Sequence, residues 1–398
     1  MKFKFLLFVG VTALFIACES DDTADIIIND NSVTNITNTT GGDPDSGTSA
    51  VNLSGVYTED LELDPAIEYI ITGPVLMADG STLRIPAGMT IKAQPVGVNA
   101  YIAIQQGAQI EAVGTASSPI VLTSNASSPS SGDWGGLVMC GRAPINSTPD
   151  GSTDTATSEV GGLSYGGDTS ADNSGTLSYV RIEYAGGAID GNAELNGLSL
   201  YAVGSGTTID YVEIYEGSDD GVEFFGGTVN ASHIVVVNAE DDSIDWTEGY
   251  TGTLTDIYIQ HGTSHDKGFE CDGYNTDFSN ETGSFSAPNI TNVTIVGAND
   301  GGEAIRLRAG SQGIFTNIHI SLFNEAFDLD GDTGDNPTGQ GVLDGVLAVN
   351  DVTFDMVDVK LKNDTGYMFN ESDFISGDGN GTGTDIGTWG QSWTIGIN

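Results

Sequence analysis

The chain has 398 residues, of which 11 are Lys or Arg and 56 are Asp or Glu, and its formal net charge at pH 7 is −45. This charge excludes simple electrostatic binding to nucleic acid or to anionic lipid, because both are themselves negative. It suits solubility and the capture of cations. The chain has 55 glycines, short apolar runs separated by polar residues, and no sustained helical periodicity, so its composition indicates an all-β fold.

The N-terminus carries a targeting signal. MKFKFLLFVGVTALFIAC begins with lysines and continues as an apolar run that ends in Ala17, before Cys18. The run is short for a membrane span and is typical of a secretion signal. FIAC resembles the bacterial lipoprotein box, and ESDD after it resembles the acidic export tag of Bacteroidota surface lipoproteins. The resemblance implies a signal peptide over residues 1–17, lipidation of Cys18, and a location on the outer face of the outer membrane.

Residues 18–51 are polar, acidic and poor in aromatic side chains. Such a segment cannot bury enough apolar surface to fold by itself. We expect it to be a flexible tether that holds the following domain away from a membrane.

From about residue 52 the chain repeats. The segments TIDYVEIYEGSDDGVEFFGG (208–227) and SHIVVVNAEDDSIDWTEG (232–249) each contain an alternating strand, a polar turn, a second short strand and then Gly. A repeat of 22–25 residues without helical segments is typical of one coil of a parallel β-helix. We therefore predict a single β-helix domain over 52–398 with an N-terminal cap. At the other end, we expect Trp389 and Trp393 to cover the last coil, which would otherwise be an open edge.

Several segments carry a resemblance to a known family: GDWGGLVMCGRAPIN (132–146), NGLSLYAVGSGTTIDYVEIYEGSDDGVEFFGGTVNA (196–231) and the terminal TWGQSWTIG. They resemble Bacteroidota surface or secreted right-handed parallel β-helix proteins, most of which have no assigned function. That family is related in architecture to pectate-lyase-like proteins. The likeness spans about 80–398, and it implies fold and compartment but little about activity.

Alternation along DDGVEFF places Val222 and Phe224 inward and Glu223 outward. Because neighbouring coils stack about 4.8 Å apart, a sequence repeat becomes a column of side chains. The predicted outward column is Ser199, Glu223, Asp245, Glu270, Arg306 and Asp328. A second outward column is Phe225, Thr247, Asp272, Arg308 and Asp330. The turn before the short strand gives a third column of Asn196, Asp220, Asp242, Lys267, Glu303 and Glu325.

Like charges that face each other across a ladder destabilise it unless solvent, cations or raised pKa values relieve them. Lys267 and Arg306 supply positive charge at two places, but no basic residue is expected beside six carboxylates: Asp219, Asp220, Glu223, Asp241, Asp242 and Asp245. These six are candidate ligands of Ca²⁺, which takes about six to eight oxygens. They could equally be solvated turns without a function, because Asp and Gly are favoured in turns.

Three functions remain open. The leading hypothesis is a cell-surface module that binds or adheres to carbohydrate or another polymer, with or without Ca²⁺, through Asp220, Asp242, Asp272, Arg308 and Asp330. The alternative is a polysaccharide lyase or glycoside hydrolase, for which paired carboxylates are required. Its catalytic candidates are Glu223, Asp245, Glu270, Arg306 and Asp328. A third hypothesis is an accessory subunit of an outer-membrane uptake or secretion complex.

Overall fold

The computed structural model describes residues 50–149, 154–190, 193–331 and 337–397. The chain divides into two units, Met1–Ile36 and Thr37–Asn398, and the described residues all belong to the second. The signal peptide, Cys18 and residues 18–49 of the tether lie outside the described residues. Within the described ranges, no helix has the length and apolar character needed to cross a membrane.

The predicted fold class is confirmed: the chain is a right-handed parallel β-helix with few helices. The opening coils contain β1 (Val51–Tyr57), β2 (Leu61–Glu62), β3 (Tyr69–Met77), β4 (Thr82–Ile85), β5 (Thr90–Ala93), β6 (Ile102–Ile104), β7 (Gln109–Val113), β8 (Ile120–Ser124) and β9 (Leu137–Cys140). Two antiparallel hairpins project from the coils: β10 (Thr155–Thr157) with β11 (Ser164–Gly166), and β13 (Ala188–Asp190) with β14 (Ala193–Glu194).

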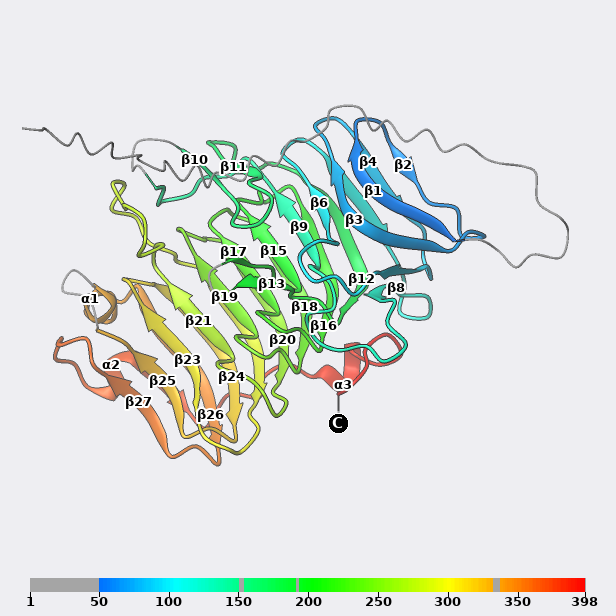
Figure 1. Ribbon diagram of the computed structural model, residues 1–398. Coiled ribbons are helices and arrows are strands. Elements are labelled where there is room, and N and C mark those ends of the chain that lie inside the picture. The colour runs from blue at the N-terminus through cyan, green and yellow to red at the C-terminus, as the bar shows by residue number, and fades with distance from the viewer. Residues whose placement is uncertain (1–49, 150–153, 191–192, 332–336, 398) are drawn as a thin grey trace, which may run out of the picture. The chain divides into compact units, whose positions relative to one another are not determined.

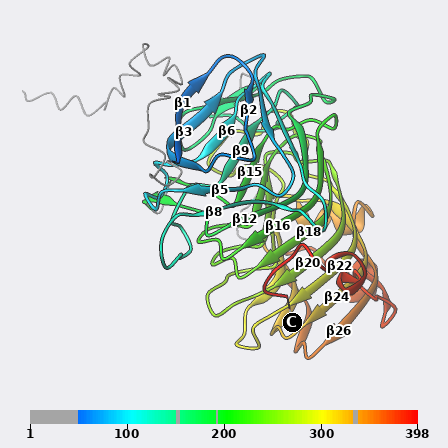
Figure 2. The ribbon, with the colours of Figure 1, turned by 90° about the vertical axis from the view of Figure 1, so that its right-hand side faces the viewer.

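Later coils alternate a long and a short strand (Figures 1 and 2). The long strands are β12 (Gly175–Glu183), β16 (Thr208–Tyr215), β18 (Asn230–Val237), β20 (Thr253–Gln260), β22 (Asn289–Val296), β24 (Gly313–Ser321) and β26 (Leu347–Asp355). The short strands are β15 (Leu198–Tyr201), β17 (Val222–Phe225), β19 (Ile244–Thr247), β21 (Phe269–Asp272), β23 (Glu303–Arg308), β25 (Glu325–Leu329) and β27 (Val359–Asn363). The remaining elements are α1 (Thr338–Leu343), which lies between β25 and β26, and then α2 (Glu371–Phe374), β28 (Ile375–Asp378) and α3 (Ile386–Trp389), which follow β27.

Each long strand contributes one half to each of two faces of the β-helix. Strand β12 pairs with β7 through residues 175–178 and with β8 through residues 180–182. Between them Tyr179 has a φ of 51°, in the left-handed region, and bends the strand. Later coils bend at the same point, at Tyr211, His233, Asp256, Asn292, Asn317 and Asp351. The long strands therefore form two faces, and the short strands form the third.

The core is built by alternation, as predicted. Val222 pairs with Ile244 and Phe224 with Trp246 in the adjacent coil, and all four side chains are buried. Burial of side chains of this size stabilises the fold by roughly 1.5–3 kcal/mol each. The register is repeated from coil to coil, so the apolar column fixes which residues point outward.

The β10–β11 hairpin covers part of the outward face of the short strands. The ring of Tyr165 in the hairpin lies 4.8 Å from that of Tyr201, which stacks on Phe225 at 4.0 Å. Phe225 is consequently buried although it points away from the core. This face is apolar under the hairpin and becomes acidic in the coils that follow.

The expectation that Trp389 and Trp393 cover the last coil is wrong. The ring centroid of Trp393 lies 5.9 Å from that of Tyr211, and that of Trp389 lies 5.0 Å from that of His233. Figure 1 accordingly draws α3 beside the green strands β16 and β18, away from β27. The residues at which the long strands bend, from Tyr179 to Asp351, form a column that we call the bend column. It offers stacked aromatic rings with a polar edge, which is a better surface for two tryptophans than the open end of the coil stack.

Candidate functional site

The predicted outward column lies in register. Glu223 pairs with Ser199 on one side and with Asp245 on the other. Asp245 pairs with Glu270, and Arg306 connects Glu270 to Asp328. The next coil adds Lys362, which pairs with Asp328 and which the sequence reasoning missed.

The other two columns also follow the register of the coils. Asp272 pairs with Arg308, and Glu303 pairs with Glu325. Asp330 follows the end of β25, but its amide donates to Leu307 O at 2.9 Å, so it continues the register beside Arg308. Its carboxylate forms an ion pair with Arg306. The turn before the short strands is tied together by side chains: the Asp242 amide donates to Asp220 Oδ1 at 3.0 Å, and the Lys267 amide donates to Asp242 Oδ1 at 2.7 Å.

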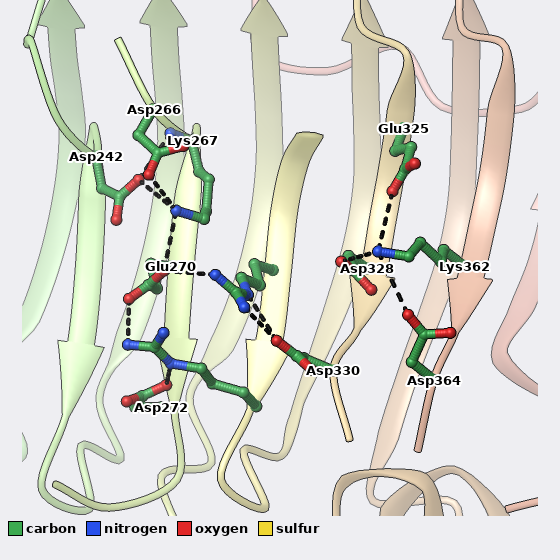
Figure 3. Close-up of polar contacts among 12 residues, drawn as sticks. Asp242, Asp266, Lys267, Glu270, Asp272, Glu325, Asp328, Asp330, Lys362 and Asp364 are labelled. Atoms are coloured by element: carbon green, nitrogen blue, oxygen red, sulfur yellow. Dashed lines mark hydrogen bonds and ion pairs between the residues drawn. The ribbon is translucent and has the colours of Figure 1, made fainter. Parts of the chain in front are cut away.

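In the coils from β21 to β27, acids and bases neutralise each other (Figure 3). Arg308 binds Glu270 and donates from Nε to Asp272 Oδ1 at 2.5 Å. Arg306 binds Asp330 and lies 3.8 Å from Glu270. Lys362 Nζ lies 2.9 Å from Asp328 Oδ2. Although desolvation lowers it, the pKa of Arg308 is raised overall by the charges of Asp272 and Glu270. A general base must give up a proton near the working pH, so this pairing argues against a base role for Arg308.

Lys267 corrects part of the prediction that the acidic turns lack a basic neighbour. Its buried ammonium lies 3.7 Å from Asp242 Oδ1, 2.5 Å from Asp266 Oδ2 and 3.0 Å from Glu270 Oε1. Asp242 therefore has a positive partner.

For five other carboxylates the prediction holds. Among the described residues, no Lys, Arg or His forms an ion pair with any member of a set that we call the unpaired cluster: Asp219, Asp220, Glu223, Asp241 and Asp245. Asp220, Glu223 and Asp245 each offer an oxygen, and these oxygens lie within 4.8 Å of one another. Asp245 Oδ1 is shielded from solvent and has no hydrogen-bond partner in the described part of the chain. Glu223 accepts one bond, from Asn196 Nδ2 at 2.7 Å.

The cluster is electrostatically unfavourable when fully ionised. Desolvation, followed by the charges of Asp245 and Glu223, raises the pKa of Asp220 well above its usual range. Desolvation and the charge of Glu194 raise the pKa of Asp219 to about 8. Raised pKa values in a convergent group are typical of functional sites, although ion networks also produce them. Protons or a bound cation would relieve this repulsion.

Glu159 and Glu194 were not anticipated. Glu159 lies between β10 and β11, Glu194 lies in β14, and the charges of both raise the pKa of Asp219. Both residues come from hairpins outside the repeat, so no periodic signal could have placed them beside the column.

Comparison with known proteins supports the fold. Residues 55–394 match the model of a family described as the pectate-lyase like beta helix domain. The catalytic domain of a GH87 alpha-1,3-glucanase in complex with tetrasaccharides is similar over 83% of this chain and 62% of that chain, with 11% identity and a TM-score of 0.31. The present chain thus spans less than two thirds of that chain, and the family assignment rests on the match over residues 55–394 alone. No curated protein matched the sequence.

Proposed function

We propose that this chain, which belongs to the pectate-lyase-like β-helix family, binds a carbohydrate polymer along the outward face of its short strands and holds Ca²⁺ at the unpaired cluster. The observation that carries the proposal is the convergence of Asp220, Glu223 and Asp245 without a basic partner among the described residues. Stacking alone forces their charges together, because the core residues beside them fix the register.

A hard divalent cation fits the donors. The cluster offers only oxygens, and Ca²⁺ accepts carboxylate, carbonyl and water oxygens in a flexible geometry. Asp220 is 7% exposed and is the most buried of the three carboxylates. Glu223 and Asp245 are partly exposed and could present a bound ion to solvent or to polymer hydroxyls. A bound cation would also reduce the repulsion that this acidic surface exerts on an acidic polymer.

A glycoside hydrolase is the second candidate. It is favoured by the raised pKa values of the same residues, because an acid that stays protonated near neutral pH can protonate a leaving group. Here Glu223 and Asp245 would be the acid and its ionised partner. A lyase that uses Arg306 or Arg308 as its base is less well supported, because carboxylates hold both guanidiniums.

The proposed location is the outer membrane, with the lipid on Cys18 as the anchor and a polymer or an outer-membrane complex as the partner. The support is the resemblance of FIAC and ESDD to lipoprotein signals. Metabolic labelling with a fatty acid tests the anchor: wild type should carry the label, and Cys18→Ser should not. A labelled Cys18→Ser protein, or an unlabelled wild type, would refute it.

Thermal unfolding in EDTA, Mg²⁺ and Ca²⁺ tests the main proposal. A ligand at 100 times its Kd that binds only the folded chain adds about 2.7 kcal/mol. We expect Ca²⁺ to raise the melting temperature of wild type and to do so much less for Glu223→Gln. Glu59→Gln, at an exposed acid outside the cluster, is the matched control. Retardation of the same variants in gels containing polysaccharide, and assays for released sugar, then separate binding from hydrolysis. An equal Ca²⁺ response in wild type and Glu223→Gln would exclude this ion site.

A further inference from the structure

A second group of carboxylates converges in the neutralised half of the column. Glu303, Glu325 and Asp328 each offer an oxygen, and these oxygens lie within 4.8 Å of one another. Glu303 and Glu325 pair in register on β23 and β25, and Asp328 lies three residues after Glu325 on β25. None of the three belongs to the unpaired cluster.

Two oxygens of this group lack the partners that burial requires. Asp328 is 4% exposed, yet its Oδ1 has no hydrogen-bond partner among the described residues. The same is true of the shielded Glu303 Oε2. Buried polar atoms in folded proteins are almost always hydrogen-bonded, and an exception requires an explanation such as an ion. The Asp328 and Glu303 carboxyl groups are direct neighbours, and desolvation together with a hydrogen bond between them raises the pKa of Glu303 to about 7. The two facing oxygens therefore share either a proton or a cation.

Lys362 explains how Asp328 is oriented (Figure 3). Its Nζ lies 2.9 Å from Asp328 Oδ2 and 3.8 Å from Glu325 Oε2. The lysine therefore satisfies one Asp328 oxygen and leaves the other directed into the carboxylate group. The charges of Arg306 and Lys267 also act on Glu303 and lower its pKa, but both residues form ion pairs with other carboxylates.

We propose that Glu303, Glu325 and Asp328 form a second site for a divalent cation that prefers oxygen ligands, with Ca²⁺ as the probe. The Glu325 side chain is 31% exposed, so the site is open on that side. Three protein carboxylates leave coordination positions for water or for a hydroxyl group of a ligand. The site does not depend on the unpaired cluster, which shares none of its ligands.

Equilibrium dialysis against radioactive Ca²⁺, with the folded state of every variant checked by far-UV circular dichroism, tests the proposal. We expect Glu303→Gln to bind one ion fewer than wild type, and Glu223→Gln to lose a different ion if the proposed function is also right. The two failures are distinguishable, because each variant removes ligands from one site only. Undiminished stoichiometry in Glu303→Gln would overturn the second site whatever Glu223→Gln does.

Lys362 supplies a test with the opposite sign. Lys362→Met removes a competing positive charge, and we expect the site to bind Ca²⁺ several-fold more tightly. Lys360→Met, two residues away on the same strand and paired with Asp378, is the matched control and should leave the affinity unchanged. If the Glu303–Asp328 pair holds a shared proton instead of an ion, neither Glu303→Gln nor Lys362→Met will change Ca²⁺ binding, and that result would overturn the proposal.

Discussion

Glu223 and Asp245 lie opposite each other on the adjacent parallel strands β17 and β19, and neither forms an ion pair with a basic residue in the described chain. On both sides of them the core pairs Val222 with Ile244 and Phe224 with Trp246, so the two acids cannot move apart without a change of register. A slip of one residue would turn the apolar side chains to solvent. The core therefore holds the two charges together.

Buried carboxyl groups inside and outside the unpaired cluster give the fold a stability that falls as the pH rises. Desolvation raises the pKa of Asp219 to about 8, of Glu213 to about 8 and of Glu248 to about 7. In the range between these values and the usual pKa of about 4, the folded chain binds protons that the unfolded chain has released. The unfolding free energy contributed by these groups is therefore present at low pH and lost as the pH rises through their folded values.

In EDTA, we expect the melting temperature of wild type to increase as the pH is lowered from about 8 to about 6.5. Asp245→Asn should show a shallower dependence, because it removes one of the charges that raise the pKa of Asp220. Glu59→Gln serves as the control and should follow wild type. A melting temperature that decreases over this range would contradict the assignment of raised pKa values.

The ion pairs of Arg308 lead to a prediction about urea unfolding. Arg308→Met leaves the buried Glu270 and Asp272 without their guanidinium. Removal of one partner from a buried pair costs about 3–5 kcal/mol, and we expect about 2 kcal/mol here because the Arg308 side chain is 29% exposed. Arg308→Lys should restore little, since an ammonium cannot contact both carboxylates in the planar fork geometry.

The double variant Arg308→Met, Asp272→Asn is the check on that explanation. It removes the charge of Asp272, which loses its ion-pair partner in Arg308→Met while Glu270 keeps Lys267, and it should recover part of the lost unfolding free energy. If Asp272→Asn lowers the unfolding free energy of Arg308→Met as much as it lowers that of wild type, the loss arises from packing and the ion-pair explanation is wrong.

The sequence predicted the columns because two periodicities act together. Alternation assigns Glu223 to the outward face, and the 22-residue repeat brings Asp245 beside it, so local information is sufficient. Lys362 and Trp393 were not placed correctly for a different reason. Lys362 follows a long insertion that hides the repeat, and Trp393 contacts Tyr179, which is more than 200 residues earlier in the chain. Such contacts are set by tertiary packing and leave no periodic pattern.

We expect the C-terminal segment around Trp389 and Trp393, which we call the brace, to stabilise the long strands by packing against the bend column. The Trp393 side chain is fully buried, its carbonyl accepts a bond from Arg181 Nη1 at 3.1 Å, and the Ile395 amide donates to Glu213 Oε1 at 2.9 Å. Trp393→Ala should lower the unfolding free energy by about 3–5 kcal/mol, the usual cost of truncating a buried Trp. Far-UV circular dichroism should remain that of a β-helix, because the coils pair with one another without the brace.

The partly exposed Trp389 provides the comparison, and Trp389→Ala should cost less unfolding free energy than Trp393→Ala. Equal losses in the two variants would show that Trp393 has no special role.

His261 provides the last prediction, and its sign is opposite to that of the carboxylates. The ring is 7% exposed and stacks on His265 with centroids 4.4 Å apart. Desolvation, followed by the charge of His265, lowers the pKa of His261 to about 4, although a backbone hydrogen bond with Lys267 and the charges of Asp300 and Asp266 oppose the shift. Between about pH 6.5 and 4 the unfolded chain binds a proton at this residue that the folded chain does not. Stability from the neutral ring is therefore present above pH 6.5 and is lost as the pH falls.

His261→Phe keeps the contact with Phe323 and removes the titrating group, so the variant should lose less unfolding free energy than wild type between pH 6.5 and 4.5. His319→Phe, on β24, is the control and should behave like wild type. Parallel pH profiles for wild type and His261→Phe would show that His261 does not titrate on unfolding.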